Sequence, residues 1–125
     1  GKLSKSGTAY RRALRDIAEN NLSQVEVMLA TARRQDRKNA ALSEALDYGL
    51  RQVQSRQRRF DSLAPPPDFK KNHLAITPIL ADLTGLAREL HDRPPLTPSA
   101  SQSASERLAQ VHARLEEALD VVAGY

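Results

Sequence analysis

The sequence predicts an all-α protein of one domain, residues 1–125, folded as an antiparallel up-down-up-down four-helix bundle. Its 18 alanines and 17 leucines far outnumber its nine valines and isoleucines, which favours helices over sheets. Apolar residues also recur at alternating spacings of three and four in four stretches, the pattern of helices that pack at shallow angles. Six of the seven prolines fall in two clusters, residues 65–67 and 94–98, which interrupt this pattern.

The first predicted helix covers residues 8–35 and the second covers residues 39–63. Their apolar stripes are Tyr10, Leu14, Ile17, Val25, Met28, Leu29 and Ala32, then Leu42, Leu46, Leu50, Val53, Phe60 and Leu63. Residues 33–39 form a polar run without an apolar side chain to hold a seam, and Asp36 or Asn39 could cap a new helix. We therefore expect a hairpin here. The alternative is one continuous helix of about 55 residues, which would need a partner chain.

The third helix is expected over residues 68–91, with Asp68 as its N-cap directly after the prolines. The fourth is expected over residues 103–123, where Ser103 and Glu106 have the spacing of a capping box, although Thr97 and Pro98 could begin it earlier. Residues 1–7 are expected to be a disordered N-terminal segment, and residues 93–102 a mobile linker within the domain.

Basic residues are unevenly distributed along the chain. Residues 1–62 carry 13 basic and 7 acidic side chains, whereas residues 63–125 carry 6 and 8. In the predicted topology, one end of the bundle collects the start of the first helix, the end of the second, the start of the third and the end of the fourth. We name it the proline-loop end. Eight basic residues at this end form a candidate surface for anionic partners. They are Arg11, Arg12, Arg15, Arg56, Arg58, Arg59, Lys70 and Lys71.

The same end gathers most of the aromatic residues. We expect Tyr10, Phe60, Phe69 and His73 to form a candidate pocket beneath the basic side chains. The alternative is that these rings only close the end of the bundle while the arginines solvate its rim. His73 lies on the apolar stripe of the third helix, where a histidine is more often a buried, hydrogen-bonded packing residue than a ligand.

Several kinds of active site lack the residues that they need. Without cysteine there is no disulfide or zinc–thiolate site. No Gly-x-Ser-x-Gly elbow or glycine-rich phosphate loop occurs. Two of the three histidines, His73 and His91, fall at opposite ends of the third predicted helix and His112 falls on the fourth, so no metal site is expected. None has the lysine and glycine that follow the phosphorylated histidine of phosphotransfer domains. We therefore predict a protein that is not an enzyme and has no cofactor.

The segment Leu63-Ala64-Pro65-Pro66-Pro67-Asp68-Phe69, followed by His73, resembles a feature of small bacterial extracytoplasmic helical proteins. In those lipoproteins and singly anchored proteins, one helix ends in Leu-x-Pro-Pro and the next opens with a hydrophobic residue and then a histidine. The resemblance covers about 20 residues. It implies an exported, non-enzymatic helical domain and names no ligand.

Together these features predict an interaction or sensory module of an exported or membrane-tethered bacterial protein, located in the periplasm or cell envelope. Its expected partner is another protein or an anionic membrane surface, and the chain itself is expected to be a monomer or a homodimer. The alternative, which ranks second, is a cytoplasmic basic bundle that binds nucleic acid or another polyanion.

Overall fold

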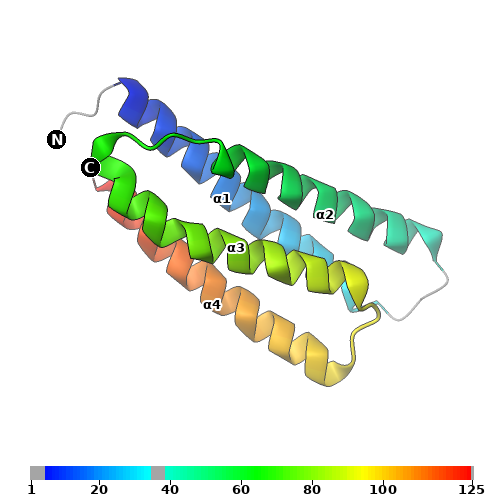
Figure 1. Ribbon diagram of the computed structural model, residues 1–125. Coiled ribbons are helices and arrows are strands. Elements are labelled where there is room, and N and C mark those ends of the chain that lie inside the picture. Colours follow the sequence, from blue (N-terminus) through cyan, green and yellow to red (C-terminus); the bar gives the residue numbers. More distant parts are fainter. Residues whose placement is uncertain (1–4, 35–38, 125) are drawn as a thin grey trace.

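A computed structural model describes residues 5–34 and 39–124 and confirms the predicted four-helix bundle (Figure 1). The helices are α1 (Lys5–Ala32), α2 (Ala40–Asp61), α3 (Lys70–Asp92) and α4 (Pro98–Ala123), and a short 3-10 turn, η1 (Pro67–Phe69), precedes α3. Consecutive helices run in opposite directions, so the start of α1, the α2–α3 connection and the end of α4 share one end of the bundle. No helix in the described part of the chain is long and apolar enough to cross a membrane.

The first two helices form the expected hairpin, which rules out one continuous helix. α1 ends at Ala32, and α2 begins again at Ala40, where the side chain of Asn39 accepts a hydrogen bond from the Ala41 amide at 2.9 Å. The other candidate cap, Asp36, lies outside the described residues. The two helices then pack closely against each other, with Gly49 of α2 against Met28 of α1.

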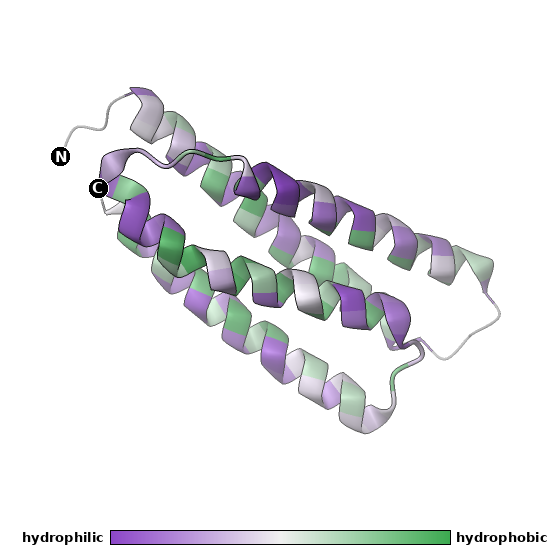
Figure 2. Ribbon diagram, viewed as in Figure 1, coloured by the Kyte–Doolittle hydropathy of each residue, from purple (hydrophilic) through white to green (hydrophobic). Residues whose placement is uncertain are grey.

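The four helices are not equivalent in the packing. α1 and α3 contact each other and each also contacts α2 and α4, whereas α2 and α4 occupy opposite corners of the bundle. The core consists of the apolar stripes, and the outward faces are polar (Figure 2). One polar side chain, Asn21, is buried among them at 1% exposure. Its Nδ2 donates to the Val53 carbonyl at 3.3 Å, so it joins α1 to α2.

Several predicted helix bounds differ from the structure, and α1 and α2 end at Ala32 and Asp61, before the predicted ends at residues 35 and 63. α4 begins at Pro98 and not at Ser103, so residues 98–102 of the expected linker are helical. The side chain of Thr97 accepts from the Ala100 amide at 3.1 Å, and Pro98 tolerates the first helical position because an amide there needs no partner within the helix. α1 begins at Lys5, so residues 5–7 of the expected disordered segment are helical, and residues 1–4 lie outside the described residues.

The start of the third helix also differs from the prediction. Pro67 begins the 3-10 turn η1, so Asp68 lies inside that turn and makes no capping hydrogen bond to α3. Phe69 takes the N-cap position of α3 and is buried at 1% exposure. The turn therefore places an aromatic ring at the helix start, where the sequence favoured a carboxylate.

Candidate functional site

The structure brings the four predicted pocket residues into one cluster at the proline-loop end. Tyr10 comes from α1, Phe60 from α2, Phe69 from η1 and His73 from α3. The rings of Phe60 and His73 stack with centroids 4.4 Å apart and planes 9° apart. Tyr10 stacks on Phe69 at 5.4 Å, and its hydroxyl lies 2.8 Å from Nδ1 of His73.

Burial favours the uncharged forms of both polar members of this cluster. It lowers the pKa of His73, an effect that the nearby Asp61 carboxylate partly offsets. Burial also raises the pKa of Tyr10 to about 12. A neutral imidazole whose proton is on Nε2 can accept a hydrogen bond from the Tyr10 hydroxyl at Nδ1.

Tyr10, Phe60 and Phe69 are at most 4% exposed, and all three belong to the hydrophobic core. The rings therefore fill the space between three helices. Their geometry is that of side chains that close the end of the bundle, which was the alternative to a pocket. The cluster fixes the positions of the helix ends that carry the basic side chains.

The eight predicted basic residues divide into two groups. Four have partners within the protein. Arg59 pairs with Asp16 at 2.7 Å, and Arg56 reaches the buried Asn21 at 3.4 Å. Arg15 lies 3.5 Å from Glu19, and Arg11 donates to the Ala123 carbonyl at 3.4 Å. Three of these contacts join α1 to α2 or α4, and the contact from Arg15 to Glu19 lies within α1, so this half of the set already has internal partners.

The other four are Arg12, Arg58, Lys70 and Lys71. All are exposed, and none makes a hydrogen bond or ion pair through its side chain within residues 5–34 and 39–124. They come from α1, α2 and α3, whereas the last two turns of α4 carry Glu116, Glu117 and Asp120. The proline-loop end is therefore basic over three helices and acidic along the fourth.

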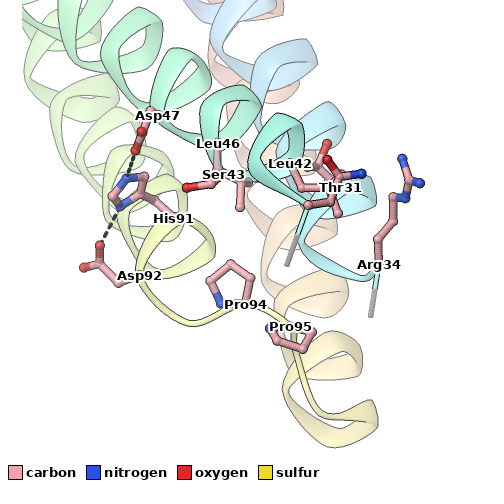
Figure 3. Close-up of a pocket in the computed structure, with 11 residues that line it drawn as sticks. Thr31, Arg34, Leu42, Ser43, Leu46, Asp47, His91, Asp92, Pro94 and Pro95 are labelled. Carbon is pink, nitrogen blue, oxygen red and sulfur yellow. Dashed lines mark hydrogen bonds and ion pairs between the residues drawn. The ribbon is translucent and has the colours of Figure 1, made fainter. Parts of the chain in front are cut away.

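The opposite end of the bundle holds a site that the sequence analysis missed. The imidazole of His91 on α3 lies between two carboxylates, with Nε2 2.6 Å from Asp47 on α2 and Nδ1 2.7 Å from Asp92 (Figure 3). Hydrogen bonds to Asp92 and then to Asp47 raise the pKa of His91. Both nitrogens can donate only in the imidazolium form, so the protonated ring links α2 to α3.

A cavity of about 270 Å³ lies beside His91. Its walls come from the end of α1, the start of α2, the end of α3 and the Pro94-Pro95 segment, as Figure 3 shows. The Leu96 amide donates to the Ala32 carbonyl at 3.2 Å, so the α3–α4 connection is hydrogen-bonded to the end of α1. No local pattern predicts this site, because Asp47 and His91 are 44 residues apart in the sequence.

The remaining histidine, His112, lies 2.8 Å from Glu116 and 4.0 Å from Glu26 on the surface. In the part of the chain that the structure describes, no three His, Asp or Glu side chains are grouped so that they could hold a metal ion.

Comparison with known proteins finds no counterpart: no protein-family model, no curated protein and no solved structure matches this chain.

Proposed function

We propose that this chain is a non-enzymatic interaction module whose proline-loop end binds an anionic membrane surface. The observation that carries the proposal is the group of four exposed, unpaired cations, Arg12, Arg58, Lys70 and Lys71, on three helices at one end of the bundle. Cations without an internal partner keep their full charge for an external one. The four paired arginines, in contrast, already have internal partners, and three of them connect two helices.

The expected affinity follows from the number of free cations. Each Lys or Arg near an anionic leaflet contributes about 1 kcal/mol, so four contribute about 4 kcal/mol, or roughly a thousand-fold in binding. This attraction is screened within a Debye length of about 8 Å at physiological salt. The packed aromatic cluster supports the proposal, since it presents the cations on fixed helix ends and their binding needs little ordering of the backbone.

The proposal includes an exported or membrane-tethered bacterial setting, in the periplasm or cell envelope. Its support is the resemblance of residues 63–69 and His73 to extracytoplasmic helical proteins. A membrane-tethered domain stays within reach of the lipid surface that anchors it, so this setting and the basic end agree.

The test reverses the free cations and leaves the paired ones intact. The variant Arg12→Glu/Arg58→Glu/Lys70→Glu/Lys71→Glu disturbs no internal ion pair. Its matched control carries the same change of net charge at four exposed, unpaired arginines on the rest of the surface: Arg34, Arg51, Arg88 and Arg93. Binding is measured by cosedimentation with phosphatidylglycerol vesicles and with neutral phosphatidylcholine vesicles, at low and at physiological salt.

We expect the protein and the control variant to bind the anionic vesicles, and the proline-loop variant to lose this binding. Equal loss in both variants would show that net charge alone matters and would overturn the proposal. So would binding to duplex DNA at physiological salt without vesicle binding, which would support the nucleic-acid alternative.

A further inference from the structure

Three arginines of α1 surround one open depression at the proline-loop end. Arg11, Arg12 and Arg15, with Ala123 of α4, line a volume of about 320 Å³. Arg12 makes no side-chain contact with a partner in the described ranges. The site therefore presents three guanidinium groups, each with five N–H donors in a fixed plane.

The internal contacts of these arginines use few of those donors. Arg11 donates one hydrogen bond to the Ala123 carbonyl at 3.4 Å, and Arg15 donates one to the Glu19 carboxylate at 3.5 Å. Both distances are at the long limit of a hydrogen bond. Glu19 is the acidic side chain that pairs within this group, and 57% of it is exposed, so it competes only weakly for Arg15.

The spacing of the arginines gives a second argument. Arg11 and Arg15 are four residues apart on α1, a separation at which like charges repel and destabilise a helix. A contact surface that needed only solubility would gain nothing from this arrangement. A bound anion with two negative charges would neutralise most of the three positive charges.

We propose that this depression is a site for a phosphomonoester dianion, an inference that rests on the proposed binding of anionic surfaces. A phosphomonoester carries nearly two negative charges at neutral pH and has three terminal oxygens, which planar guanidinium groups bind in pairs. A phosphodiester has one charge and two such oxygens. Ala123, whose carbonyl lies 3.4 Å from Arg11, forms the α4 side of the depression. The group could be a lipid headgroup or a soluble phosphomonoester, and the two share this chemistry.

The experiment keeps the positive charge at each position and removes the planar guanidinium group. In the variant Arg11→Lys/Arg12→Lys/Arg15→Lys the net charge is unchanged, but no side chain can form paired N–H···O bonds. The matched control replaces three exposed, unpaired arginines outside this end, Arg34, Arg51 and Arg88, with lysine. Vesicles containing phosphatidic acid are compared with phosphatidylglycerol vesicles of equal surface potential. Glycerol 3-phosphate, followed by the arginine side-chain NMR signals, tests a soluble source.

We expect the protein and the control variant to bind phosphatidic acid about ten-fold more tightly than phosphatidylglycerol, a difference of one charge-assisted contact. The α1 lysine variant should lose this preference and keep its binding to phosphatidylglycerol. An equal preference in all three proteins would overturn the site and leave the proposed function standing. If the unmodified protein binds no vesicles but glycerol 3-phosphate still shifts the NMR signals of Arg11, Arg12 and Arg15, the site stands and the proposed function is overturned. If the protein prefers phosphatidic acid and glycerol 3-phosphate does not shift the arginine signals, the ligand is a lipid headgroup. If glycerol 3-phosphate also shifts these signals, the site accepts the phosphomonoester from either source.

Discussion

The hydroxyl of Tyr10 lies 2.8 Å from Nδ1 of His73, and this hydrogen bond joins α1 to α3 within the aromatic cluster. The two helices pack against each other along the bundle, and each also contacts α2 and α4. A polar contact between them at one end therefore influences the position of all the helix ends around it. The basic side chains of the proline-loop end are mounted on these helix ends.

Replacing Tyr10 with phenylalanine tests this hydrogen bond. Tyr10→Phe keeps the ring that stacks on Phe69 and leaves the half-buried Nδ1 of His73 without a donor. We expect a loss of about 1–2 kcal/mol in the free energy of unfolding, measured with urea at pH 7.5. A loss within error of zero would mean that solvent replaces the hydroxyl, and the contact would then be incidental.

His73 should make the protein less stable in acid. Burial lowers the pKa of His73 in the folded state, so its stabilising contribution is complete above the unfolded pKa of about 6.5. The contribution is lost as the pH falls from there through the folded pKa, because the unfolded chain takes up the proton first. His73→Gln keeps an acceptor for Tyr10 and does not titrate. Between pH 7.5 and pH 5, the unfolding free energy of the natural sequence should therefore fall more than that of this variant, and the reverse order would contradict the geometry of the cluster.

His91 should act in the opposite direction. The hydrogen bonds to Asp92 and Asp47 raise its pKa, so its contribution is complete below about pH 6.5 and is lost as the pH rises through the folded pKa. Asp47→Asn removes one carboxylate and should lower the midpoint at which the His91 ring protons titrate by NMR. The accompanying loss of stability should be at most about 1 kcal/mol at pH 5.5, because both partners are partly exposed, and smaller at pH 8.5. An unchanged midpoint would show that Asp47 does not bind the ring in solution.

The close approach of α1 and α2 at Gly49 gives a packing test. A Cβ added to Gly49 would lie 2.7 Å from Cγ and 2.9 Å from Sδ of Met28, so the methionine has to move. We expect Gly49→Ala to destabilise the protein, although alanine is intrinsically better in a helix by up to about 1 kcal/mol. In a Met28→Ala background the overlap is gone, and the same change should become stabilising. Urea unfolding of the four proteins measures this coupling, and equal effects of Gly49→Ala in both backgrounds would contradict it.

The sequence predicted the helices well because their apolar spacing is regular, and it failed where two local signals competed. Ser103 with Glu106 has the spacing of a capping box, but Thr97 followed by Pro98 also starts a helix. The earlier start adds residues 98–102, about one and a half turns, and brings Ser101 within 2.7 Å of Arg33, which directly follows α1. Such contacts between helices decide the boundary and are not visible in the local sequence.

The candidate sites show the same limit. The topology predicted which residues meet at the proline-loop end, because helix direction and length fix that. It could not predict which arginines pair internally, since the contact of Arg59 with Asp16 depends on how α1 and α2 are rotated about their axes. The link between Asp47 and His91 was missed for the same reason. Rotation follows from the packing of particular side chains, such as Met28 against Gly49.

The most direct test of the central claim is to map the face that meets a membrane. Backbone amide NMR signals of the protein are compared with and without phosphatidylglycerol nanodiscs, at low and physiological salt. We predict that the signals that broaden or shift most belong to the first turns of α1, the last turn of α2 and the start of α3, around Arg12, Arg58, Lys70 and Lys71. The largest changes at Arg34, Arg51, Arg88 and Arg93, or changes spread evenly over the four helices, would contradict the account.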